Sequence, residues 1–88
     1  SGRTAMLKKE VAVEKKEYLM KLLEKMFSLD HFVNRLKIPH EYVKGFEYYI
    51  VDNEKFITIL KSNNKTMTSF LISELAIKYN EIIASENK

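Results

Sequence analysis

The sequence predicts a small, mainly α-helical domain that contains one β-hairpin. Apolar residues recur with a 3.6-residue period in the first and last thirds of the chain, which is typical of amphipathic helices. The single proline, Pro39, separates two short helical patterns near the middle. A segment rich in aromatic and β-branched residues, 46–60, is divided by a polar break, which is typical of a hairpin. We therefore expect the order helix, helix, helix, hairpin, helix.

Length and composition exclude several classes of protein. A chain of 88 residues forms one domain, which we place at residues 6–88. Its 45% hydrophobic and 31% charged residues indicate a folded protein, and no apolar run approaches the roughly 20 residues of a membrane span. We expect a cytoplasmic protein. Because so short a chain buries a thin core and has no cysteine for disulfides, we also expect a homodimer.

The first five residues, Ser1–Ala5, are predicted to be a remnant of an expression vector ahead of a natural start at Met6. They contain no apolar stretch of the kind that a signal peptide needs. They are left out of the fold prediction.

The first predicted helix runs from about Lys9 to Phe27. Its apolar side chains share one side of the helical period, namely Val11, Tyr18, Leu19, Leu22, Leu23, Met26 and Phe27. The other face alternates lysines with glutamates and includes Glu17 and Lys21 at the spacing of a favourable ion pair. This charged face is expected to be solvated.

The next two predicted helices lie on either side of Pro39. Ser28 is a suitable N-cap and Asp30 places a negative charge in the first turn, so a second helix is expected over residues 29–37. Pro39 ends it, because the residue before a proline is disfavoured in the α conformation. A short third helix begins at the proline and ends near Gly45.

Residues 46–60 are predicted to form the hairpin. Two runs of aromatic and β-branched residues, 46–51 and 56–60, flank the polar residues 52–55. A small all-α bundle is the alternative, because part of the segment also fits a helical spacing. The positions concerned are Val43, Phe46, Tyr49 and Ile50.

The last predicted helix follows a loop at residues 61–65 and reaches about Ala84. Thr66, Thr68 or Ser69 is expected to cap it. One apolar stripe comprises Leu71, Leu75, Tyr79 and Ile82, with Ile72, Ala76 and Ile83 beside it. A second stripe points in a different direction and comprises Phe70, Ile77 and Ala84. Because a helix apolar over so wide an arc is usually covered on two sides, we predict that the second stripe is a dimer interface.

Charge is distributed unevenly along the chain. Residues 1–44 hold ten lysines or arginines and six acids, whereas residues 45–88 hold five bases and six acids. Two windows contain no acid, His31–His40 and Lys55–Ser73. Such local asymmetry favours a polyanionic partner, although the overall charge of +3 is ordinary.

Residues 28–46 carry a pattern that resembles the helix-turn-helix of DNA-binding proteins. The apolar positions are Leu29, Phe32, Val33, Leu36, Ile38, Tyr42, Val43 and Phe46. In that family a first helix carries an apolar pair, resembled by Phe32 and Val33, and a turn residue fills the core, resembled by Ile38. The long helix before and the hairpin and helix after imply a winged helix-turn-helix domain.

The chain departs from the family pattern at four positions. Val33 stands where a small residue is frequent, and Lys37 stands where the turn often has glycine. Pro39 replaces a serine or threonine cap, and Gly45 shortens the recognition helix. The alternative is two short helices that meet at a turn in a small helical domain.

The resemblance implies a set of DNA contacts. The recognition helix would enter the major groove by its N-terminal turns, with His40, Glu41 and Lys44 toward the bases. The DNA backbone would be contacted by Asn34, Arg35 and Lys37. The hairpin tip with Lys55, and Lys61 and Lys65 behind it, would form the wing.

Residues that would support catalysis or metal binding are sparse. The chain has no cysteine, no glycine-rich phosphate loop and no recognisable Ser, His and acid set. His31 and His40 have Asp30 and Glu41 beside them, but this spacing matches no compact metal site. We therefore expect no enzyme activity, no cofactor, no metal and no small-molecule substrate.

Two functions are consistent with these patterns. The first is binding of duplex DNA at specific sequences by a homodimer that acts in transcription regulation, partition, replication or recombination. The second is a helical adaptor or inhibitor that presents Phe70 and Ile77 of the last helix to another protein.

Overall fold

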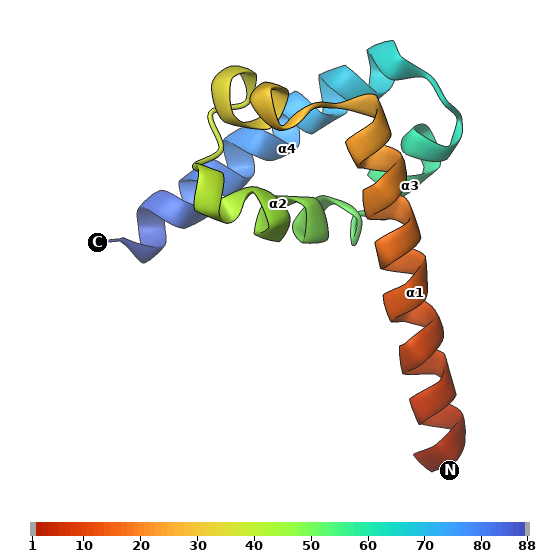
Figure 1. The fold of residues 1–88 in the computed structure, drawn as a ribbon. Helices are drawn as coiled ribbons and strands as arrows, with labels where there is room; N and C mark the ends of the chain where they lie inside the picture. The colour runs from red at the N-terminus through yellow and green to blue at the C-terminus, as the bar shows by residue number, and fades with distance from the viewer. Residues whose placement is uncertain (1, 88) are drawn as a thin grey trace.

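The computed structural model describes residues 2–87, with side chains for residues 13–87. The elements are α1 (Gly2–Met26), the π-helix η1 (His31–Arg35), the 3-10 helix η2 (His40–Tyr42), α2 (Val43–Ile50), α3 (Glu54–Lys61) and α4 (Lys65–Glu86) (Figure 1). Residues 2–87 contain no strand. The chain is therefore a small all-α bundle, and the expected winged helix-turn-helix with a hairpin is wrong.

The predicted hairpin at 46–60 is replaced by the end of α2, a short turn and α3. Asn53, in the polar break, is the N-cap of α3 rather than a hairpin turn residue, and its side chain accepts a hydrogen bond from the Phe56 amide at 2.9 Å. Phe46 and Ile50 are both fully buried at a spacing of four residues, as are Phe56 and Leu60. The helical period decides the conformation here, and β propensity is overridden by packing.

Two predicted boundaries in the middle of the chain are also wrong. Gly45 lies inside α2 instead of ending a helix. A Cβ atom at this position would meet the Tyr79 hydroxyl of α4 at 2.7 Å, so glycine permits the close approach of α2 to α4. The second helix ends at Arg35, and Lys37 adopts a positive φ of 61°.

The long helices at the two ends agree with the sequence in kind but differ at their limits. Leu19 and Leu23 of α1 are fully buried as expected, whereas Tyr18 is exposed. The side chain of Val11 lies outside the described side chains. The cap of α4 is Asn64, whose side chain accepts from the Met67 amide at 3.0 Å, and not the expected threonine or serine.

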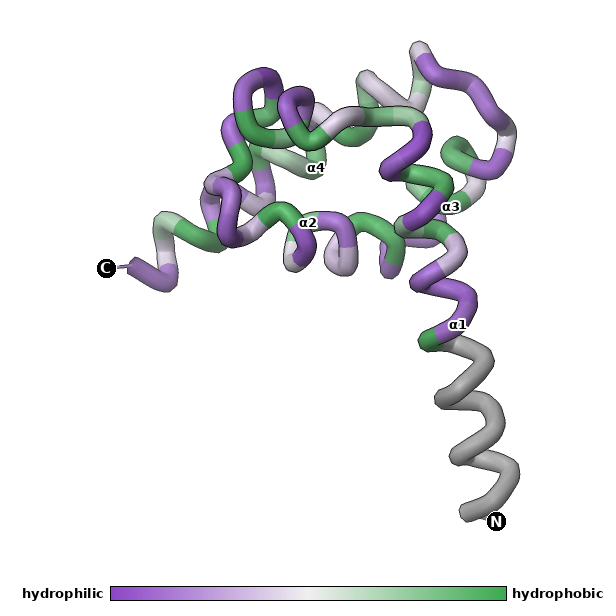
Figure 2. Tube along the Cα trace, in the orientation of Figure 1, coloured by the Kyte–Doolittle hydropathy of each residue, from purple (hydrophilic) through white to green (hydrophobic). Residues whose placement is uncertain are grey.

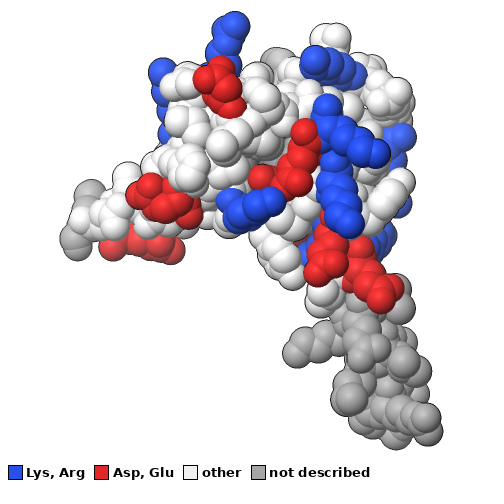
Figure 3. All heavy atoms as spheres, in the orientation of Figure 1, with Lys and Arg blue, Asp and Glu red and all other residues white. Residues whose placement is uncertain are grey.

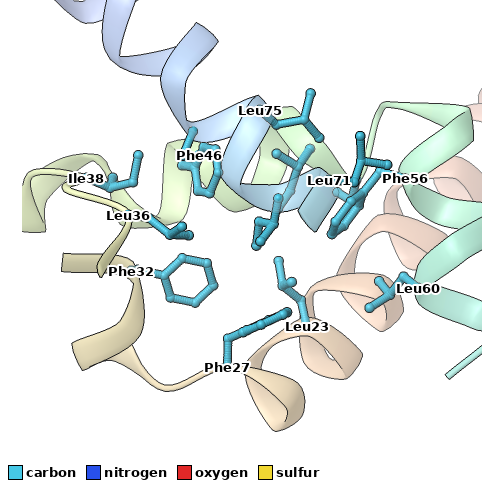
Figure 4. Packing of buried hydrophobic residues seen from close by; sticks show 14 of the residues in the cluster. Leu23, Phe27, Phe32, Leu36, Ile38, Phe46, Phe56, Leu60, Leu71 and Leu75 are labelled. Carbon is cyan, nitrogen blue, oxygen red and sulfur yellow. The ribbon is translucent and has the colours of Figure 1, made fainter. Parts of the chain in front are cut away.

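The core is one cluster with buried side chains from α1, η1, α2, α3 and α4, and Tyr42 of η2 packs against it (Figure 4). The buried side chains that converge there include Leu23, Phe27, Phe32, Leu36, Ile38, Phe46, Phe56, Leu60, Leu71 and Leu75. Hydrophobic and hydrophilic residues alternate along the coloured part of the chain, and the C-terminal end of α4 projects beyond the bundle (Figures 1 and 2). No helix within residues 2–87 has both the length and the apolar character that crossing a bilayer requires.

Candidate nucleic-acid interface

A polar hollow of about 750 Å³ lies where the end of α1, η1 and the start of α4 meet. Its basic lining residues are Lys25, His31, Arg35 and Lys65, and its hydroxyl residues are Ser28, Ser69 and Ser73. No acidic residue lines it among the residues that the structure describes. Its lining draws on both acid-free windows, which are distant in sequence. We call this feature the basic hollow.

Local capping positions these basic side chains. The Ser28 hydroxyl oxygen accepts a hydrogen bond from the His31 amide at 3.2 Å, which starts the helical turn of η1 as predicted. The Phe27 ring stacks on the His31 imidazole with centroids 4.9 Å apart. Asn64 caps α4, so Lys65 is the first residue of that helix. The cationic side chains are therefore carried by helix ends packed on the core.

The electrostatics of His31 report a positive potential in the basic hollow. Partial burial is the main cause that lowers the pKa of His31, and the charges of Arg35 and Lys65 lower it further. Asp30 acts in the opposite direction and is the smallest contributor. A neutral imidazole beside two cations is a site where a bound anion would favour protonation.

Of the nine residues predicted to contact DNA, the structure brings Arg35 and Lys65 together in the basic hollow. Asn34 is exposed, and its amide donates to the Asp30 carboxylate. Two residues assigned to the wing lie on a helix instead, because Lys55 is in the first turn of α3 and Lys61 is in its last turn. Because residues 2–87 form no hairpin, the assignment of these residues to a wing is wrong.

The residues predicted to contact bases lie away from the basic hollow. His40 and Lys44 line a second pocket, and Glu41 is exposed on η2. The Lys44 ammonium forms an ion pair with the Glu24 carboxylate of α1. Hydrogen bonding to Glu24 is the main cause that raises the pKa of Lys44. Lys44 is therefore engaged within the protein rather than free to contact a base.

The turn between η1 and η2 is tightly fixed. The Leu36 amide donates to the His31 carbonyl at 3.0 Å, the π-helical bond, and the Ile38 amide donates to the Phe32 carbonyl at 3.0 Å. From α4, the side-chain amide of Asn80 donates to the Leu36 backbone carbonyl at 3.3 Å. Five of the eight apolar positions of the helix-turn-helix pattern are buried, namely Phe32, Leu36, Ile38, Val43 and Phe46. Val33 and Tyr42 are half-buried, and Leu29 is exposed.

Lys25, His31 and the serines were missed as members of one site. Lys25 belongs to the lysine and glutamate face that is expected to be solvated, and the sequence pattern assigns His31 no metal site. The signal that would have found His31, Ser69 and Ser73 is present in the sequence, because all three lie in the two acid-free windows. Only the folded structure shows that the windows meet, because residues of η1 and of the start of α4 line the same hollow.

The stripe predicted as a dimer interface lies on the outer side of α4. Phe70 is 64% exposed and Ile77 is 62% exposed, and Ala84 is exposed as well. On the face shown in Figure 3, the charged side chains visible at the far end of α4 are acidic, whereas lysines and arginines gather toward the upper and right-hand parts. The described residues contain no group of three or more potential metal ligands.

The chain matches no protein-family model, no curated protein and no solved structure. The function is therefore argued from the geometry alone.

Proposed function

We propose that this protein binds duplex DNA through contacts between the basic hollow and the phosphate backbone. The observation that carries the proposal is the joining of Lys25, Arg35 and Lys65 in one polar hollow without an acidic lining residue. Phosphate contacts by lysine and arginine supply most of the affinity for nucleic acid that does not depend on sequence. Serine hydroxyls and helix N-termini, here that of α4, are further groups that contact phosphates.

The arrangement around the hollow supports duplex DNA as the polyanion. Two short helical segments, η1 and η2 with α2, are joined by a fixed turn that resembles a helix-turn-helix. In that motif the helices lie against the backbone and in the major groove of a duplex. Because Lys44 is paired with Glu24, we assign the basic side chains to backbone contacts and assign no base contact to this helix.

The test is fluorescence anisotropy with a labelled duplex of random sequence, at several salt concentrations. Three cationic contacts predict a slope of log affinity against log salt of about −3. Changing Arg35 or Lys65 to alanine should weaken binding at low salt and reduce the slope by about 1 in each case. Both side chains are exposed, so neither change should unfold the protein.

Lys78 is the matched control, because it is an exposed lysine of α4 that does not line the hollow. Lys78→Ala should leave the slope close to that of the unchanged protein. No retention of duplex at low salt would overturn the proposal, as would equal losses from Lys78→Ala and Lys65→Ala. Tighter binding to single-stranded DNA or to RNA of the same length would reassign the partner.

A second candidate is a protein-interaction function of α4. The exposed Phe70 and Ile77 lie seven residues apart on one side of the helix, where a partner helix would bury them. Sedimentation equilibrium separates the alternatives. A dimer lost on changing Ile77 to aspartate supports self-association through α4, and with it a two-fold arrangement on DNA. A monomer that retains no duplex favours the adaptor.

A further inference from the structure

The second pocket, of about 400 Å³, lies between the end of α1, η1 and the start of α2. Phe27, Leu29, Phe32 and Val43 form its apolar wall, and the rings of Phe27 and Phe32 lie edge to face with centroids 6.4 Å apart (Figure 4). Glu24, Glu47, Lys44, His40 and Ser28 complete the lining. It shares only Phe27 and Ser28 with the basic hollow. We call it the carboxyl pocket.

Glu47 is the unusual member of this pocket. Its side chain is only 2% exposed, and its Oε1 atom has no hydrogen-bond partner among the described residues. A buried polar atom without a partner is costly, and an apolar residue of similar size would stabilise the same position better. Glu47 lines the pocket, so a donor that enters beside its side chain would supply the hydrogen bond that this buried oxygen lacks.

The charges around Glu47 indicate what that donor is. Burial is the main cause that raises the pKa of Glu47 to about 8, and hydrogen bonding to Glu24 and its negative charge raise it further. Glu24 is already balanced by Lys44, and Lys21 is the other cation that acts on it. The remaining lining residue with a basic side chain, His40, is exposed on η2. Lys44 also favours the charged form of Glu47, but its charge is the smallest of the causes and does not offset burial and Glu24.

We infer that the carboxyl pocket binds an organic cation with an apolar body, a primary amine in the simplest case, whose ammonium group donates to Glu47. The apolar wall accepts the body of the ligand, and the two phenylalanine rings suit a cation beside them. Leu29, at 52% exposure, adds an apolar surface at the rim. The ammonium replaces the proton of Glu47 as the group that neutralises this carboxyl, so binding releases a proton to solvent.

The experiment is isothermal titration calorimetry of the full chain with 2-phenylethylamine at about pH 7, in two buffers that differ in ionisation enthalpy. Two neutral or anionic probes of similar shape, 2-phenylethanol and 3-phenylpropionate, are titrated in parallel. The amine should bind about tenfold more tightly than either, with a proton released on binding. Glu47→Gln should weaken the amine by about tenfold and abolish the proton release.

Arg35→Ala is the control, because Arg35 lines the basic hollow and not the carboxyl pocket. It should leave amine binding unchanged even where it weakens DNA, so the two proposals fail separately. The inference is overturned if the amine does not bind, if the alcohol or the acid binds as well, or if Glu47→Gln binds the amine equally.

Should Glu47→Gln fail to fold, carbon-13 NMR of the Glu47 carboxyl in the unchanged protein decides the matter. Saturating amine should lower the apparent pKa of that carboxyl by about one unit. A titration curve that the amine does not move would overturn the inference.

Discussion

The basic hollow and the carboxyl pocket lie next to each other, separated by Phe27 and Ser28, and they treat charge in opposite ways. In the basic hollow the cations Arg35 and Lys65 remain exposed to water, so gathering them costs little. In the carboxyl pocket Glu47 is withdrawn from water, and its pKa rises to about 8. Each site therefore avoids repulsion between like charges in its own way. The cations of the basic hollow are solvated, whereas Glu47 of the carboxyl pocket is protonated beside Glu24.

This difference has a consequence for recognition. Solvated cations attract a polyanion over a long range and release it with added salt. A buried acid contributes to binding only when a ligand enters the pocket and displaces its proton. The two sites should therefore respond to different variables, the basic hollow to ionic strength and the carboxyl pocket to pH.

The largest expected effect comes from removing the wall that the two sites share. Phe27 is 5% exposed and contacts the rings of His31 and Phe32. Phe27→Ala should lower the free energy of unfolding by about 3–5 kcal/mol, because it leaves a cavity in the core. Urea denaturation measures the loss. Phe70→Ala, on the outer side of α4, is the control and should change stability by less than about 0.5 kcal/mol. If Phe27→Ala costs no more free energy of unfolding than Phe70→Ala, the shared wall does not stabilise the fold.

The second effect tests the buried acid. Because the pKa of Glu47 is raised from 4.5 to about 8 in the folded protein, the fold binds a proton that the unfolded chain releases between these values. Stability from this group is therefore full below about pH 4.5 and is lost as the pH rises toward 8. Glu47→Gln should remove most of this decline and be more stable than the unchanged protein at pH 8.

Urea denaturation at several pH values from about 5 to 8 gives the slope. Glu54→Gln, at an exposed position in the first turn of α3, should leave the decline in place. If the free energy of unfolding declines with pH as steeply in Glu47→Gln as in the unchanged protein, the raised pKa of Glu47 is wrong.

The two sites also differ in how far the sequence predicts them. The acid-free windows contain three of the four basic residues of the hollow, but sequence alone does not show that residues 31–35 and 65–73 line the same hollow. The carboxyl pocket has no signal of its own. Glu47 stands between Phe46 and Tyr48, and the helical register of α2 turns its side chain inward beside Val43 and Ile50. A buried acid is rare enough that sequence reasoning places it outside.

The fold shows the same limit at residues 46–60. The long helices were predictable because their apolar period extends over many turns. In the short segment, Phe46, Ile50, Phe56 and Leu60 fit a helix, while β-branched neighbours such as Ile57 and Ile59 favour a strand. Asn53 lies in the polar break between the two runs and caps α3. Asparagine serves in both turns and caps, so its identity does not separate the two conformations.

A smaller effect is expected in the turn that leads from the basic hollow to the carboxyl pocket. Lys37 has a φ of 61°, which costs a residue with a Cβ atom about 1 kcal/mol relative to glycine. Lys37→Gly should therefore raise the free energy of unfolding by up to about 1 kcal/mol. Lys37→Ala keeps the strain and removes the charge, so it should not stabilise the protein. Stabilisation by alanine as large as that by glycine would attribute the gain to charge instead of the backbone.

The smallest expected effect separates the two sites by pH. His31 is neutral near pH 7 because burial, Arg35 and Lys65 lower its pKa below 6.5. Phosphates bound in the basic hollow would raise that pKa, so DNA affinity should increase as the pH falls from about 7.5 to 5.5. About threefold is expected, which corresponds to half a pKa unit of coupling. Anisotropy at constant salt measures it. His31→Gln should abolish the increase and His40→Gln should not, because His40 lines the carboxyl pocket. Loss of the pH dependence in His40→Gln alone would move the DNA contact from the basic hollow to the carboxyl pocket.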